Sequence, residues 1–161
     1  MLSAMVTGGL LEHYEAAIAG LPLLVSFIPM LMDTGGNCGA QASTMIIRGL
    51  ALDEIELKDF FRVWWKEISV ALICGAALSA VNFIRIIIQY GDIGVAAVVS
   101  LTLIITVCVA KSLGCILPII AKRLKLDPAI MASPIITTLT DACSVFVYFT
   151  IATAMLRGRL I

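Results

Sequence analysis

Long apolar runs separated by short polar stretches dominate the chain. A helix that crosses a bilayer needs about 20 mainly apolar residues. The runs that meet this length extend from about Pro22 to Ile47, Val63 to Tyr90, Gly94 to Ala121 and Pro128 to Leu156. The apolar run before Glu12 is too short to span and lacks the basic residues and cleavage site of a signal peptide, so we expect it to be the end of a spanning helix that begins outside this sequence.

The composition supports a membrane location. Hydrophobic residues make up 61% of the chain and charged residues 14%, with a mean hydropathy of +1.07. Soluble domains have about 45–50% apolar and about 25% charged residues. We therefore predict an all-α, polytopic membrane helical bundle with five transmembrane helices, the first one partial. The formal net charge of zero argues against a nucleic-acid partner.

Basic residues indicate the orientation, because Lys and Arg are retained on the cytoplasmic side. They gather in two loops, which we therefore predict to be cytoplasmic. One loop contains Arg48, Lys58, Arg62 and Lys66, and the other contains Lys122, Arg123 and Lys125. The opposite loops carry only Arg85, whereas Arg157 and Arg159 at the C-terminus count against the scheme. We expect a multi-pass protein of the cell membrane.

The segment DEIELKDFFRVWWKEI has a helical apolar pattern. Its apolar residues recur at i, i+3, i+4, i+7, i+8 and i+11: Leu57, Phe60, Phe61, Trp64, Trp65 and Ile68. Tryptophan favours the headgroup region. We predict an interfacial helix that runs into the next span, with Asp53 as its N-cap.

Two of the predicted spans carry a polar face. At about 100° per residue, the polar side chains of the first complete span share a narrow arc: Asp33, Asn37, Gln41, Thr44 and Arg48. The last span repeats the pattern with Ser133, Thr137, Asp141, Ser144 and Tyr148. An ionised side chain at the bilayer centre costs about 2.5–3.5 kcal/mol on insertion scales. Both faces should therefore lie against protein or water.

Glycine and proline interrupt the same spans, at Gly35, Gly36, Gly39, Pro29 and Pro134. One interpretation is a weakened helix whose freed carbonyls coordinate a cation in a wet cavity. The alternative is close helix packing, because Gly35 and Gly39 have the small-xxx-small spacing. Packing alone explains the glycines but leaves Asp33 and Asn37 unexplained.

The polar faces are rich in oxygen ligands. Carboxylate, amide and hydroxyl oxygens suit Mg²⁺ or Ca²⁺, and no His or Cys cluster favours Zn²⁺ or Cu⁺. The cysteines lie in apolar runs without CxxC spacing and indicate packing roles. Mg²⁺ loses water reluctantly and needs only one or two carboxylates. A pore that grips a hydrated ion through Asp141 therefore favours Mg²⁺ as the transported and bound ion.

Three segments resemble the transmembrane domain of the MgtE magnesium channels and transporters: PMLMDTGGNCGAQASTMIIRGLALDEI, SLGCILPIIAKRLKLDPAIMASP and PIITTLTDACSVFVYF. The resemblance extends from about Pro22 to the end, with GGNxGxQ, RGLAL, DPA and TTLTD in the family's order. It implies a homodimer that is not an enzyme, with the ion path on the two-fold axis between the second and fifth helices. The whole chain, residues 1–161, would be this ion-conducting domain.

The resemblance also implies roles for single residues. Asp141 corresponds to the acid that holds Mg²⁺ through its water shell, Asn37 to a pore amide, and Thr137 offers a carbonyl or hydroxyl. The remaining pore-lining candidates are Asp33, Gly36, Gln41, Thr44, Ser133, Thr138, Ser144 and Tyr148. The soluble N-terminal and CBS domains of the family are missing, so we expect a fragment or a member that is regulated differently.

Lys111 is a cation inside a predicted span and should be neutralised there. We consider Asp33 as its partner, because Asp141 is assigned to the ion; the alternative is that Lys111 snorkels toward the cytoplasm.

Two other functions also involve carboxylates within the membrane. An intramembrane aspartyl protease would need YD and GxGD motifs, which MDTGG and TLTD do not match. A proton- or sodium-coupled divalent cation exporter of the same fold would use Asp33, Asp141 and Lys111 as a charge relay.

Overall fold

All regular elements among the described residues are helices. The computed structural model describes residues 2–14, 22–131 and 134–156. Its elements in chain order are α1 (Leu2–His13), η1 (Pro22–Phe27), α3 (Ile28–Ala51), η2 (Leu57–Asp59), α4 (Phe60–Tyr90), α5 (Ile93–Arg123), η3 (Pro128–Met131) and α6 (Pro134–Met155), where η denotes a 3₁₀ helix. The all-α prediction is confirmed.

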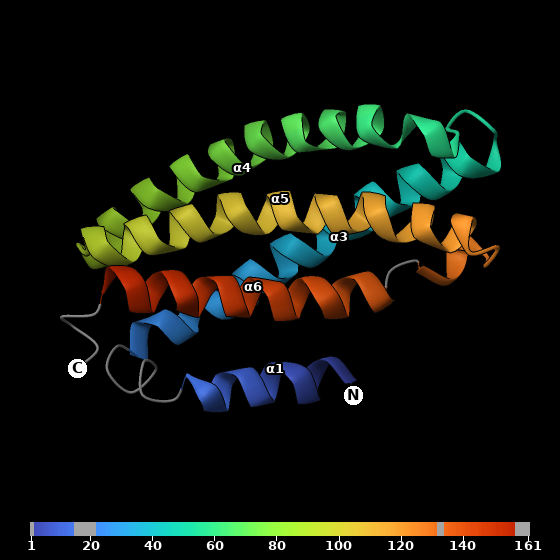
Figure 1. Cartoon of the computed structure of the whole chain (residues 1–161). Coiled ribbons are helices and arrows are strands. Elements are labelled where there is room, and N and C mark those ends of the chain that lie inside the picture. The colour runs from blue at the N-terminus through green and yellow to red at the C-terminus, as the bar shows by residue number, and fades with distance from the viewer. Residues whose placement is uncertain (1, 15–21, 132–133, 157–161) are drawn as a thin grey trace.

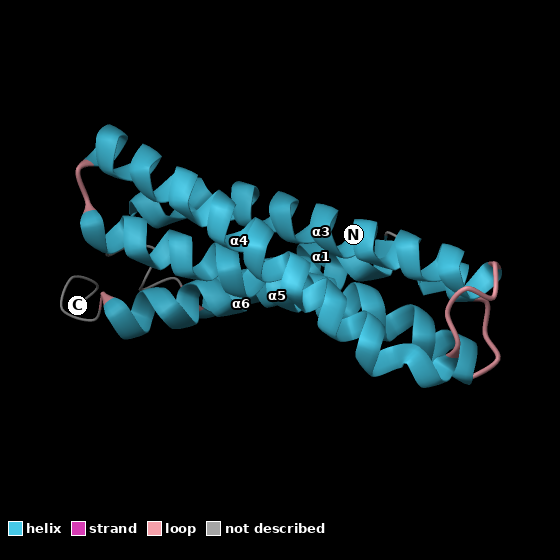
Figure 2. Ribbon diagram, turned by 90° about the horizontal axis from the view of Figure 1, so that it is seen from above, coloured by secondary structure: helices cyan, strands magenta, loops and turns pink. Residues whose placement is uncertain are grey.

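The helices form an elongated bundle. Helix α4 packs along α5, and α6 packs against α5 on the other side, with α1 along the outer edge of α6 (Figure 1). Helix α3 crosses obliquely behind and contacts both α5 and α6. The view from above shows the same elongated arrangement (Figure 2). Helix α3 therefore packs against α5 and α6 with one face, while its other face is exposed on the outside of the bundle.

Within the described part of the chain, three segments are long and apolar enough to cross a membrane: Leu57–Tyr90, α5 and α6. Helix α3 has 24 residues, which corresponds to about 36 Å at 1.5 Å per residue. Its length suits a span, but its polar residues lower its hydropathy. Whether α3 spans the membrane remains a prediction, as does the fifth, partial span.

Both basic connections lie at one end of the bundle, as the sequence predicted (Figure 1). Lys122 at the end of α5 donates a hydrogen bond of 2.8 Å to the carbonyl of Leu50 and lies 3.9 Å from the carboxylate of Asp53. At the opposite end, Gly91 ends α4 with a φ of 65°, and the carboxylate of Asp92 caps α5 by accepting from the amide of Val95 at 3.1 Å. Glycine adopts this φ without steric cost.

The predicted helix that runs into the next span is present, and its position at the membrane interface stays a prediction. Residues from Phe60 onward are the first turns of the continuous helix α4. Trp64 faces inward and donates to the hydroxyl of Ser112 at 3.1 Å, whereas Phe61 and Trp65 are 76% and 67% exposed. The N-cap prediction for Asp53 is wrong, since α4 has Asp59 at this position.

Candidate ion-conducting groove

The polar face of α3 lies on the outside of the bundle. Helix α3 is continuous through its glycines, so the arc predicted from the sequence is preserved. Its members are all exposed: Asp33, Asn37, Gln41, Thr44 and Arg48. Because α3 packs on α5 and α6 through its opposite face, these side chains remain accessible from the outside of the protomer.

A shallow groove brings the central part of this face together with α6. It encloses about 240 Å³ and is lined by Met32, Asp33, Gly36 and Asn37 from α3 and by Thr137 and Asp141 from α6. Residues about one hundred positions apart in the sequence thus share one site. Met32 is the lining residue that the polar pattern did not predict, since it is apolar.

Gly36 allows the two helices to share the groove. A Cβ atom at this position would lie 3.4 Å from Cγ2 of Thr137 and 3.8 Å from Oδ1 of Asp141. Any larger side chain would project toward these two residues and fill the space. Glycine at position 36 therefore keeps the Asp141 carboxylate accessible beside Asn37.

Hydroxyl groups along the two polar faces donate to their own helices. Thr137 and Thr138 donate to the carbonyl of Pro134 at 3.2 and 2.8 Å, and Thr44 donates to that of Ala40 at 2.9 Å. A hydroxyl whose proton is used in this way presents oxygen lone pairs as acceptors. Such oxygens suit the water shell of a cation. Gln41 and Thr44 lie farther along α3 and do not line the groove.

The polar face of α6 is divided between the groove and the interior. Ser144 and Tyr148 are buried and donate to the carbonyls of Thr140 at 2.6 Å and Leu24 at 2.9 Å. Ser144 lies against Gly35 of α3, and Tyr148 reaches η1, so this burial does not support their prediction as pore-lining residues. Ser133 lies outside the described residues.

The glycines of α3 serve close helix packing. A Cβ at Gly35 would lie 2.9 Å from both Oγ of Ser144 and Cγ2 of Thr106, and one at Gly39 would lie 2.8 Å from Cγ2 of Ile136. Both distances are too short for a real contact, so only glycine fits without a shift of the neighbours.

The interpretation that these glycines and the prolines free carbonyls is wrong. Pro29 lies in the first turn of α3 and Pro134 is the first residue of α6. The amides of a first helical turn have no partner within the helix, so a proline there costs no hydrogen bond. Backbone carbonyls are therefore not released in the middle of either helix by these residues.

Lys111 forms its ion pair with Glu67, not with Asp33. Its ammonium lies 2.7 Å from the carboxylate of Glu67, and the two side chains are 11% and 12% exposed. The pair joins α5 to α4, away from the groove. This pairing does not favour a charge relay of Asp33, Asp141 and Lys111. Sequence reasoning missed Glu67 because it was assigned to an interfacial segment rather than to the interior of the bundle.

Comparison with known proteins identifies the family. Residues 28–151 match the family described as MgtE, divalent cation transporter. This chain belongs to the MgtE family. The match begins at the first residue of α3 and ends within α6, so it contains the whole groove. With its apolar helices, this member of the MgtE family is a multi-pass protein of the cell membrane.

Curated MgtE relatives match nearly the whole chain. The magnesium transporter MgtE of Bacillus subtilis is 36% identical over 96% of this chain, and that of Thermus thermophilus is 34% identical over 98%. The corresponding protein of Enterococcus faecalis is 29% identical over 95% of the chain. The chain spans about a third of the length of these relatives, which are covered to 34%, 35% and 34% respectively.

Proposed function

We propose that this chain is the ion-conducting membrane domain of a magnesium transporter and that Mg²⁺ passes along the groove between α3 and α6. The observation that carries the proposal is the convergence of Asp33, Asn37 and Asp141 on one accessible surface. The similarity to proteins named magnesium transporter supports Mg²⁺ as the substrate.

The groove offers the ligand chemistry of a hydrated ion. Mg²⁺ keeps several of its waters and is held through one or two carboxylates. Asp141 supplies the central negative charge, and Asn37 and Thr137 supply an amide and a hydroxyl for the water shell. With these few ligands, the ion does not need to shed its hydration shell to be held in the groove.

A second copy of the chain completes the pore. The groove is open on one side, so a single protomer does not enclose an ion path. In a homodimer whose two grooves face each other, two copies of Asp141 would flank one divalent ion. Their mutual repulsion favours a cation between them, and ion binding is thereby coupled to their ionisation.

The test is Mg²⁺ uptake into liposomes that contain the purified protein or its Asp141→Asn variant. Asparagine keeps the shape of the side chain and removes the charge. We expect uptake to fall by about tenfold or more, which corresponds to about 1.4 kcal/mol or more, while the oligomeric state by light scattering is unchanged.

The matched control is Asp53→Asn, which removes an exposed carboxylate outside the groove. Asp53 has a φ of 55°, a conformation that asparagine tolerates. Uptake should be unaffected by this change. Native uptake by a correctly assembled Asp141→Asn variant would disprove the assignment of the ion path to this groove.

A further inference from the structure

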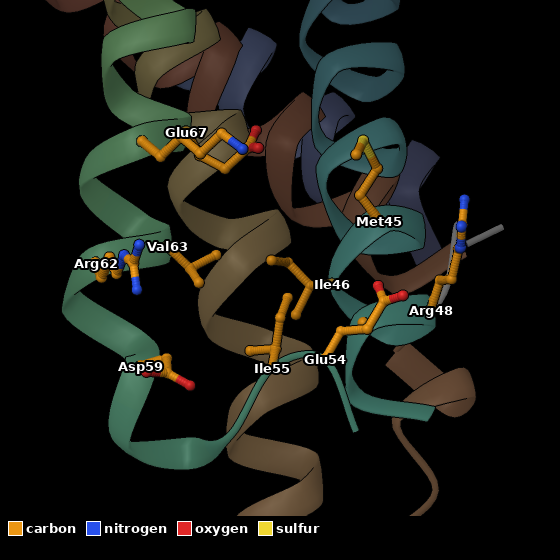
Figure 3. A pocket seen from close by; sticks show the side chains of 11 residues that line it. Met45, Ile46, Arg48, Glu54, Ile55, Asp59, Arg62, Val63 and Glu67 are labelled. Atoms are coloured by element: carbon orange, nitrogen blue, oxygen red, sulfur yellow. The ribbon is translucent and has the colours of Figure 1, made fainter. Parts of the chain in front are cut away.

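A second cavity lies between α3 and α4, at the end of the bundle that carries the basic connections. It is open, encloses about 540 Å³ and shares no lining residue with the groove. In Figure 3, Arg62 lies on the α4 side and Arg48 on the α3 side, with Ile46, Ile55 and Val63 between the two helices. The cavity therefore has an apolar interior and charged flanks.

The charged residues that line the cavity favour an anion once the ion pair of Glu67 with Lys111 is considered. The cationic members are Arg48, Arg62 and Lys66, and the anionic members are Glu54, Asp59 and Glu67. Glu67 is neutralised by Lys111, which lies outside the lining, at 2.7 Å. Three cations and two remaining carboxylates leave one net positive charge, which matches the single negative charge of a phosphodiester.

Arg62 and Lys66 form the cationic part of the α4 flank. Residues four apart lie on the same face of a helix, and both side chains are exposed. Neither forms a salt bridge with any residue that the structure describes. The carboxylate of Asp59 on the same flank accepts from the amide of Glu56 at 3.1 Å and stabilises the start of the helix.

The surroundings of this flank indicate a lipid rather than a soluble anion. Phe61 and Trp65, each adjacent in sequence to one of the two cations, are largely exposed, and exposed Met45 lies at the cavity on α3. Aromatic side chains beside cations are typical of the headgroup level of a membrane. Basic pockets between spanning helices on the cytoplasmic side bind anionic headgroups.

We propose that the cavity between α3 and α4 binds an anionic phospholipid, whose phosphate is held by Arg62 and Lys66. Arg48 contributes positive charge from the opposite flank. The acyl chains would follow the apolar surface of α4, where Ile73 is 72% exposed. This site is separate from the ion path, so the proposal does not depend on the function of the groove.

The two tryptophans of the chain, Trp64 and Trp65, lie in the sequence between the lining residues Val63 and Lys66 and can serve as probes of this cavity. The full chain is reconstituted in phosphatidylcholine vesicles that contain an equal fraction of either brominated phosphatidylglycerol or brominated phosphatidylcholine. Bromine quenches tryptophan fluorescence on contact. We expect the anionic lipid to quench the native protein about three- to fivefold more effectively, which corresponds to under 1.4 kcal/mol of preference.

The test variant is the double substitution Arg62→Gln and Lys66→Gln, which should lower this preference to about one. The matched control is Lys58→Gln with Arg123→Gln, since both residues line a different cavity at the same end of the bundle. It removes the same charge from the same membrane surface. If it lowers the preference equally, general attraction to an anionic surface explains the quenching and the site is disproved.

Two further outcomes are decisive. Equal quenching of the native protein by both lipids would show that the cavity is covered by a partner or filled without charge selectivity, and would overturn the proposal. Should the double variant fail to fold, Arg62→Lys and Arg62→Gln are compared instead. Lysine keeps the charge and should keep the preference, and a loss in both variants would contradict a phosphate site.

Discussion

Glu67 and Asp141 are carboxylates on two different helices of one bundle, α4 and α6, and their surroundings differ. Glu67 of α4 is largely buried against Lys111 of α5, with 12% of its side chain exposed. Asp141 lies in a groove that opens to the outside between α3 and α6, beside exposed Asp33 and Asn37. The first carboxylate is paired with a cation of the same chain, and the second lines a groove that is open to the outside.

This difference distinguishes a charge that is paired inside the fold from charges that line an open groove. A buried ion pair needs good geometry to offset its desolvation, and it fixes which helices face each other. An open groove instead leaves oxygen ligands in contact with whatever enters it. The following predictions test this division, beginning with the largest expected effect.

The buried pair should be sensitive to the loss of one partner. Lys111→Met leaves the carboxylate of Glu67 buried without its cation, and breaking such a pair costs about 3–5 kcal/mol. We expect the free energy of unfolding in detergent, measured by reversible denaturation, to fall accordingly. Adding Glu67→Leu should restore most of it, because the second substitution removes the uncompensated charge.

The exposed pair of Lys58 and Glu56 is the matched control. Its two atoms lie 2.9 Å apart with side chains 72% and 61% exposed, and exposed pairs contribute little. Lys58→Met should leave stability nearly unchanged. An equally small effect of Lys111→Met would mean that the pair between α4 and α5 does not stabilise the bundle.

The glycine contact behind the groove should have an intermediate effect. Gly35→Ala places a Cβ 2.9 Å from Oγ of Ser144 and Cγ2 of Thr106, and such overpacking costs about 1–3 kcal/mol. Gly9 in α1 has no atom within 4 Å of its Cβ position, so Gly9→Ala should instead stabilise its helix by about 0.5–1 kcal/mol. Thermal unfolding of the two variants measures the difference.

The two substitutions are expected to change the stability in opposite directions, so the comparison separates the effect of packing from that of helix propensity. If both alanine variants were stabilised, helix propensity would dominate at both positions and the close approach of α3 and α6 would be relaxed by small shifts. If Gly35→Ala alone is destabilised, the groove depends on glycine for its shape. Mg²⁺ uptake by the same variant would then show how far the ion path tolerates a change in helix separation.

The sequence predicted much of the groove because its residues depend on local periodicity. Asp33 and Asn37 are one turn apart on α3, and Thr137 and Asp141 are one turn apart on α6. Helical spacing alone places each pair on one face. That the two faces meet was expected only from the family resemblance, and the structure places them together.

The errors occurred where tertiary packing decides. The pair of Lys111 and Glu67 depends on the register between α4 and α5, which spacing within one helix does not determine. Tyr148 shares the periodicity of Asp141 but lies beyond the crossing with α3, where η1 covers it. The aromatic pattern at the start of α4 spans a wide arc, and only the half with Trp64 faces the bundle.

Asp33 should have the smallest effect, because it is exposed at the edge of the groove and water screens its charge. Asp33→Asn removes one carboxylate near the ion path while Asp141 remains. We expect the Mg²⁺ concentration for half-maximal uptake to rise by about two- to fivefold, with the maximal rate unchanged, which corresponds to less than 1.4 kcal/mol. This rise in the half-maximal Mg²⁺ concentration should be smaller at high salt, since screening then already weakens the attraction between Asp33 and Mg²⁺ in the native protein. The same measurement on Asp141→Asn should show a loss of maximal rate instead. If Asp33→Asn abolished uptake as completely as Asp141→Asn, the ion would be held by both carboxylates, and Asp33 would belong to the principal binding site rather than to its edge.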